Sequence, residues 1–250
     1  MRRMTPNLDV GGVISRVFAI YTKHLGVLLG IGAIIFIPLG ILEGVLSHSD
    51  SIVLRLVGSI VGLIGTYLFI GAVVRLVQDV RDGTLDASVG GLITSIGPVL
   101  VTLILVGILA SIGIVVGFVL CIIPGVFLLV SWAVVSPVIV VENAGVGAAF
   151  SRSWELVKHS WWQVLAVILL FFVIEVVAGI VLLLIFVAIS NSVILSIIAT
   201  IIARLLLAPL TALASSVIYF DLVGLQQGVA ASAPADPPLP PPPPPPAPAV

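Results

Sequence analysis

The sequence predicts an all-α membrane protein with about six transmembrane helices in three hairpins, each preceded by a short interfacial amphipathic helix. Two observations predict this class. Of the 250 residues, 60% are hydrophobic and only 8% are charged, whereas soluble domains are about 25% charged. The hydrophobic residues also gather in stretches of roughly 20, the length that a helix needs to cross the hydrocarbon core of a bilayer. No water-soluble fold of this size could bury so much apolar surface.

Six stretches are long and apolar enough to span a membrane, where every backbone N–H and C=O must be paired inside the helix. The third and fourth are divided around residues 122–123, because the run is too long for one span and Pro124 suits the first turn of a new helix. The predicted spans are residues 25–46, 52–74, 98–119, 124–141, 163–190 and 193–222.

The positions of the cations predict the orientation. The loops at residues 47–51, 122–123 and 191–192 contain no lysine or arginine. Positive loops stay in the cytoplasm, so the sequence predicts a multi-pass protein of the plasma membrane with both termini cytoplasmic. The cations on the cytoplasmic side are Arg2, Arg3, Arg16, Lys23, Arg75, Arg81, Arg152 and Lys158.

Three segments that precede spans resemble one another, namely residues 11–16, 90–95 and 147–152. The first and third continue alike, into Lys23-His24 and Lys158-His159. Their apolar residues fall on one helical face, as in helices that lie in a membrane interface. They predict three tandem units, each an interfacial helix plus a hairpin, related by an axis along the membrane normal. A chance resemblance is the alternative, because the match is short.

The chain divides into three regions by composition. Residues 1–24 form a cytoplasmic N-terminus with an interfacial helix, residues 25–223 the six-helix membrane domain, and residues 229–250 a disordered proline-rich tail. The tail includes seven consecutive prolines, Pro240 to Pro246, which favour a solvated polyproline II helix. Such a tract can bind the aromatic groove of a membrane or cytoplasmic protein partner. The alternative is a passive low-complexity tail.

Four charged residues fall inside predicted spans: Glu43, Arg55, Glu175 and Arg204. Charges are costly in a bilayer and usually have a partner or a function there. Glu175 and Arg204 lie at similar depth in consecutive antiparallel helices, and Glu43 and Arg55 lie near the ends of another hairpin, so the sequence predicts these two pairs. Each pair either fixes helix register or lines a path for protons or a solute.

Prolines and glycines inside the spans predict features of helix packing. A proline in a helix frees a carbonyl group and kinks the helix, and kinked helices can form binding sites near the bilayer midplane. Gly58 and Gly62, and likewise Gly113 and Gly117, are spaced for close helix approach, for which packing within the chain is favoured over dimerisation. The candidate kinks are Pro38, Pro137 and Pro209.

No motif of catalysis is present. The sequence has no His-Glu-x-x-His, no Gly-x-Ser-x-Gly and no phosphate-binding glycine loop. Glu43, His48 and Asp50 form the only metal-like cluster, and their spacing is too loose to predict a site. A net charge of −1 without a basic stripe argues against nucleic acid as a partner. We therefore expect no enzyme activity, no catalytic residue, no cofactor and no metal, and a lipid bilayer as the surroundings.

Two stretches resemble a known family. The first stretch is Pro137-Val138-Ile139-Val140-Val141-Glu142-Asn143-Ala144-Gly145, and it continues through Arg152-Ser153-Trp154-Glu155. The second stretch is residues 209–222, which end in Tyr219-Phe220-Asp221-Leu222. They look like the membrane domain that precedes some bacterial glycerophosphoryl diester phosphodiesterases and occurs in stand-alone inner-membrane relatives. The resemblance covers most of residues 8–228 and implies a six-helix membrane domain. It does not carry over the phosphodiesterase activity, which belongs to a separate barrel domain. Residues 223–227 also depart from the basic residues that often follow in the family.

These observations favour a non-catalytic membrane domain that assists or anchors envelope or lipid-related partners. The alternative is a small-solute transporter or channel that uses Glu175 and Arg204. An enzyme acting on lipid headgroups ranks third.

The predicted orientation can be tested with topology reporters. We expect a reporter inserted at Ser49 and a reporter fused after the proline tail to lie on opposite faces of the membrane, with the tail reporter active in the cytoplasm. Paired alkaline phosphatase and fluorescent-protein fusions measure this in cells. Both reporters on the same face would contradict the six-span topology.

Overall fold

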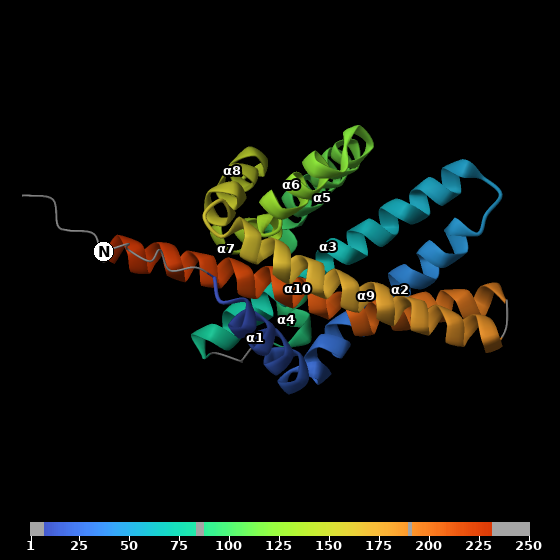
Figure 1. Cartoon of the computed structure of the whole chain (residues 1–250). Helices are drawn as coiled ribbons and strands as arrows, with labels where there is room; N and C mark the ends of the chain where they lie inside the picture. The colour runs from blue at the N-terminus through green and yellow to red at the C-terminus, as the bar shows by residue number, and fades with distance from the viewer. Residues whose placement is uncertain (1–7, 84–87, 190–191, 232–250) are drawn as a thin grey trace, which may run out of the picture.

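The structure, a computed structural model, describes residues 8–83, 88–189 and 192–231, and these ranges contain ten helices and no strand (Figure 1). The predicted all-α class is confirmed. The described residues exclude Arg2, Arg3 and residues 232–250 of the predicted disordered tail. Residues 229–231, the first part of the predicted tail, belong to the last helix, which continues to Ala231. The helices are α1 (Val10–Lys23), α2 (Leu25–Ser47), α3 (Ile52–Asp82), α4 (Val89–Thr94), α5 (Gly97–Leu120), α6 (Ile122–Ser131), α7 (Val135–Glu142), α8 (Val146–Val157), α9 (Trp161–Ile189) and α10 (Val193–Ala231).

Six segments of these helices are long and apolar enough to cross a membrane: α2, α3, α5, the α6–α7 pair, α9 and α10. Each hairpin follows one short helix, so α1, α4 and α8 take the positions predicted for the interfacial helices. Ser88 starts α4 by accepting a hydrogen bond from the N–H of Gly91 (3.2 Å). The chain is therefore a multi-pass membrane protein.

The two ends of the molecule differ in composition and packing. We name the end that holds α1, α4, α8 and the last turns of α3 and α10 the basal end. The distal end holds the turn between α2 and α3 and the start of α10. At 1.5 Å per residue, the 31 residues of α3 and the 39 of α10 extend over about 46 Å and 58 Å. Both helices are longer than a hydrocarbon core of roughly 30 Å, so they project beyond it.

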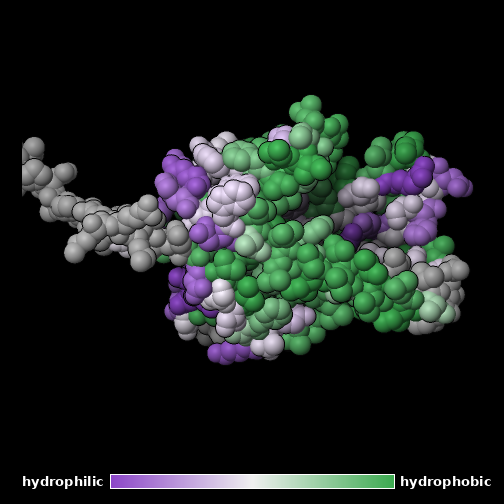
Figure 2. Space-filling view, in the orientation of Figure 1, coloured by the Kyte–Doolittle hydropathy of each residue, from purple (hydrophilic) through white to green (hydrophobic). Residues whose placement is uncertain are grey.

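Most buried side chains lie toward the basal end, where all three units meet. The rings of Phe36 and Phe69 pack at 4.9 Å between centroids, and Leu213 and Ile218 of α10 are also buried there. The α2–α3, α5–α6 and α9–α10 hairpins diverge from this core (Figure 1), and their exposed surfaces are largely apolar (Figure 2). In its most apolar stretch α9 has only 6% of its residues buried, against 50% for α3, so α9 is a peripheral, lipid-facing helix.

The fourth predicted span is not one continuous helix. Residues 132–134 form a turn that separates α6 from α7, and Cys121 alone, in an extended conformation, connects α5 to α6. Pro137 is the third residue of α7, where its missing N–H costs no helical hydrogen bond. The turn lies where a kink from Pro137 is expected, because a proline leaves the carbonyl four residues before it, here that of Ala133, without its helical partner. Helices α2 and α10 continue through Pro38 and Pro209.

The two glycine pairs pack within the chain, as predicted. A Cβ atom on Gly58 would lie 3.0 Å from the Cβ of Leu46 in α2. A Cβ atom on Gly117 would lie 2.9 Å from the Cα of Gly125 in α6. Both contacts are closer than side chains normally allow, so these glycines hold their hairpins together.

Candidate functional site

Arg204 of α10 and Glu43 of α2 form a two-point ion pair inside the predicted membrane region. Arg204 Nη2 donates a hydrogen bond to Glu43 Oε1 at 2.8 Å, and Nη1 contacts Oε2. The side chains are 29% and 20% exposed. A paired guanidinium and carboxylate satisfy one another where water is scarce. The pair therefore links the first membrane-spanning helix to the last.

Gly62 of α3 provides the space for this ion pair. The carboxylate of Glu43 lies against the Cα of Gly62, at the position where a Cβ atom would stand. Any larger residue at position 62 would overlap the carboxylate. Three helices thus build the site: α2 supplies the acid, α10 the base and α3 the space.

The predicted pairs Glu175–Arg204 and Glu43–Arg55 are wrong. A helical side chain leans toward the N-terminus of its own helix. Helices α2 and α9 begin at the basal end, so their acidic side chains, Glu43 and Glu175, lean toward the basal end. Helices α3 and α10 begin at the distal end, so their basic side chains, Arg55 and Arg204, lean toward the distal end. An acid and a base at equal depth in one hairpin therefore diverge.

Arg204 and Glu43 meet because they start at different depths. Ile201, one turn before Arg204, packs on Gly40, so the Cα of Arg204 lies nearer the basal end than that of Glu43. The two side chains then lean toward each other and close the gap. Arg55 is exposed near the distal start of α3, and within the described ranges it has no acidic side chain within 4.0 Å. Its position suits a long side chain that extends to the aqueous interface.

Glu175 lies at a separate place, between α9 and α10. Its carboxylate accepts a hydrogen bond from the Thr211 hydroxyl. Both residues line a pocket of about 260 Å³ between α6, α9 and α10. The rest of its wall is almost entirely apolar and includes Phe171, Phe172 and Ile218. This arrangement offers one carboxyl group to a largely apolar cavity.

A second, smaller pocket of about 70 Å³ adjoins the Glu43–Arg204 pair. Glu43 lines it, and its polar wall comes from Ser47, His48, Ser196 and Thr200. This volume holds only a few water molecules. The pocket at Glu175 shares no lining residue with it. Glu43 with Arg204 and Glu175 with Thr211 therefore adjoin two separate pockets.

No group of three histidine, cysteine, aspartate or glutamate residues stands close enough to hold a metal ion within the described part of the chain.

A polar cluster at the basal end was not predicted as a site. Arg152 Nε donates to both carboxylate oxygens of Glu142 at 3.2 Å, and its Nη1 donates to Gln226 at 3.1 Å. The Tyr219 hydroxyl donates to Glu142 at 2.9 Å. These bonds fix the end of α10 to α7 and α8.

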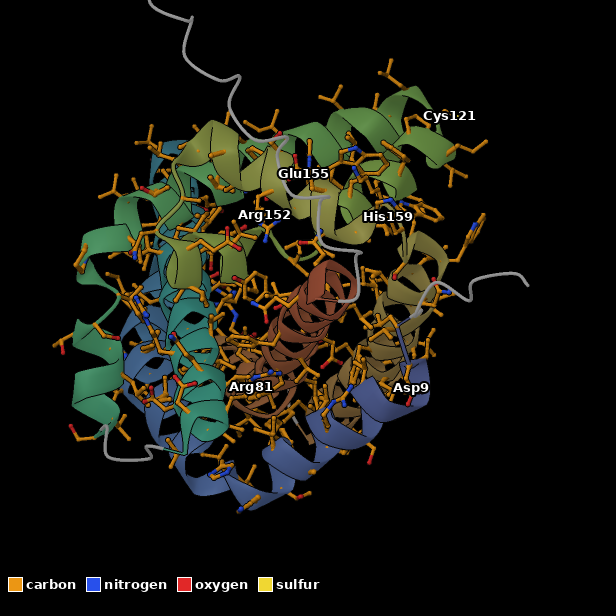
Figure 3. The ribbon with its side chains drawn as sticks, turned by 90° about the vertical axis from the view of Figure 1, so that its left-hand side faces the viewer. Asp9, Arg81, Cys121, Arg152, Glu155 and His159 are labelled. Carbon is orange, nitrogen blue, oxygen red and sulfur yellow. The ribbon has the colours of Figure 1, made fainter. Side chains whose placement is uncertain are left out.

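Two further contacts hold the same end of α10 from other helices. Arg16 of α1 forms an ion pair with Asp221, and the Arg81 guanidinium of α3 lies 4.7 Å from the ring centroid of Phe220. Figure 3 views this end of the molecule and shows Arg81 and Arg152 on elements around α10. The one sequence signal for this cluster is that Glu142, Arg152 and residues 219–221 belong to the two stretches that carry the family resemblance.

Comparisons with known proteins add no relative: no family model, no curated protein and no solved structure matches this chain.

A double-mutant cycle tests whether Glu43 and Arg204 act as a unit. We expect Glu43→Gln or Arg204→Gln alone to lower the free energy of unfolding by about 1–3 kcal/mol, because each leaves a charge unpaired. The double change should cost less than the sum of the two. Unfolding of the purified protein in mixed micelles with increasing dodecyl sulfate measures these values.

Arg55→Gln is the matched control for this cycle, since Arg55 is an exposed arginine near the same end of the molecule. Its effect should stay within about 0.5 kcal/mol. Additive effects of the two changes at Glu43 and Arg204 would contradict a coupled pair.

Proposed function

We propose that this chain is a non-catalytic domain of the plasma membrane that anchors a protein partner of the envelope or of lipid metabolism at the cytoplasmic face. The observation that carries the proposal is the way α10 ends. Beyond its most apolar part the helix continues to Ala231. Contacts from α1, α3 and α7 fix it at Tyr219, Phe220 and Asp221, and a contact from α8 fixes it at Gln226. A helix held on several sides is a rigid support for whatever follows it.

The distribution of charge supports the basal end as the cytoplasmic one. Arg16, Lys23, Arg81, Arg152 and Lys158 all belong to elements of this end. Under the positive-inside rule both termini then face the cytoplasm. This orientation places the proline-rich residues after Ala231 where cytoplasmic domains with aromatic grooves can bind them.

The arrangement of polar groups supports an anchoring role over transport. The charge of Arg204 is neutralised by Glu43 and has only a small pocket beside it. Transport through the domain needs polar groups that continue across the bilayer. The resemblance to a membrane domain that precedes some phosphodiesterases supports a partner in lipid-headgroup metabolism.

Comparative affinity purification tests the anchoring role. Full-length protein, a variant ending at residue 231 and a variant with Pro240 to Pro246 replaced by alanine would be purified in mild detergent, and bound proteins measured by quantitative mass spectrometry. We expect the full chain to enrich a reproducible partner that both variants lose by about tenfold, since alanine keeps the length of the tail and removes its polyproline II preference.

The alanine variant is the control that separates sequence-specific binding from tail length. Repeated recovery of no partner, or equal recovery by all three proteins, would reject the proposal.

Glu175 favours a second candidate function, the transfer of a proton or small solute. It is a carboxyl group hydrogen-bonded to Thr211 at the edge of a pocket of about 260 Å³, which is the kind of group that proton relays use. In liposomes loaded with a pH-sensitive dye, an imposed pH gradient should then collapse faster with the wild type than with Glu175→Gln. Arg55→Gln should behave as the wild type. Equal rates for the wild type, Glu175→Gln and empty liposomes would remove this candidate.

A further inference from the structure

A pocket of about 510 Å³ lies where α8 ends and α9 begins. Its wall is partly aromatic, from Phe127, Trp154, Trp161 and Trp162, and partly polar, from Lys158, His159 and Gln163. No acidic residue lines it. Neither the intramembrane ion pair nor the cluster around Tyr219 includes any of these side chains.

The aromatic side chains form a continuous row. The ring of Phe127 lies 5.2 Å from that of Trp154 and 6.3 Å from that of Trp161, and Trp161 lies 4.8 Å from Trp162 at an angle of 88°. Trp162 is 74% exposed. The buried indole N–H of Trp161 has no acceptor among the described residues, so one donor in this wall is unsatisfied. Tryptophan is typical of the boundary between headgroups and acyl chains.

The polar side chains of the pocket match an anionic group. Lys158 and His159 are both exposed, and the ammonium of lysine binds phosphate as a point charge. The nearest acidic side chain in sequence, Glu155, lies 3.9 Å from Arg152. Beyond the pocket, α9 continues with exposed apolar residues, among them Leu169, Phe172 and Val173, along which acyl chains can lie.

The first unit of the chain has the same Lys-His pair but not the same environment. His24 is only 9% exposed, and this burial together with the neighbouring Lys23 lowers its pKa and favours the neutral imidazole. His159 is exposed at the edge of the pocket instead. The difference shows that a Lys-His pair before a span does not by itself make an open polar site.

We propose that the pocket formed by Trp154, Lys158, His159, Trp161 and Trp162 binds the phosphate headgroup of one anionic phospholipid from the leaflet at the basal end. The indole rings hold the glycerol region at the interface, and Lys158 and His159 bind the phosphate. The site does not depend on the proposed anchoring role, because it uses none of the residues of the tail or of the α10 cluster.

Native mass spectrometry of the purified full-length chain tests this site. Phosphatidylglycerol and phosphatidylcholine with the same acyl chains would be titrated in mild detergent, and the dissociation constant of the first bound lipid measured for each. We expect the wild type to prefer phosphatidylglycerol, and Lys158→Gln combined with His159→Gln to weaken phosphatidylglycerol binding by roughly fivefold or more, because one lysine near an anionic lipid has about that effect. Phosphatidylcholine binding should change little.

Lys23→Gln is the matched control, since it removes an exposed lysine from the corresponding place in the first unit and should leave the preference unchanged. Size-exclusion chromatography checks that each variant is folded. Equal affinity of the wild type for both lipids, or unchanged binding by the double variant, would overturn the proposal. Displacement of the lipid by inorganic phosphate at equal concentration would identify a soluble anion as the ligand and overturn the assignment to lipid.

Discussion

The Glu43–Arg204 ion pair, seated on Gly62, is the interaction on which the arrangement of the distal helices depends. Two charges in a bilayer are tolerated only when they satisfy each other, and these two meet only when α2, α3 and α10 lie together. The pair thus joins segments that are 161 residues apart in the chain. The hydrophobic effect cannot impose this register in lipid, because the acyl chains are as apolar as the side chains, so the pair acts together with close packing such as that of Ile201 on Gly40.

The core lies toward the basal end for a related reason. Hydrophobic burial does not hold helices together where the solvent is lipid, so the diverging hairpins lose little by exposing leucine and valine. Near the interface, charged and polar side chains are no longer costly, so ion pairs and hydrogen bonds can connect the helices there. There Arg16, Glu142, Arg152 and Tyr219 fix the end of α10. The molecule is therefore most tightly built where it meets water and most open where it meets lipid.

Hydropathy and charge were sufficient to predict the class, the spans and the helices that precede them, because each of these depends on a local property of the sequence. The ion pairs were predicted wrongly because the prediction used only the depth of each residue along its helix and not the direction of its side chain. The direction in which each side chain leans decided that Arg204 meets Glu43 and not Glu175. Equally, nothing local reveals that Arg16 reaches Asp221, 205 residues away.

The first and third units differ at the end of the short helix that precedes each hairpin. In the first, Phe18 packs against Phe171 at 6.1 Å between ring centroids, and His24 is buried at the start of α2, so the helix end is closed by protein. In the third, Trp154 and His159 occupy the corresponding positions and line an open pocket. Two helix ends of like sequence thus have different surroundings: protein covers the first, and the second lines an open pocket. The third unit therefore suits a role at the membrane interface better than the first unit does. Its last helix, α10, is also longer than the bilayer core is thick.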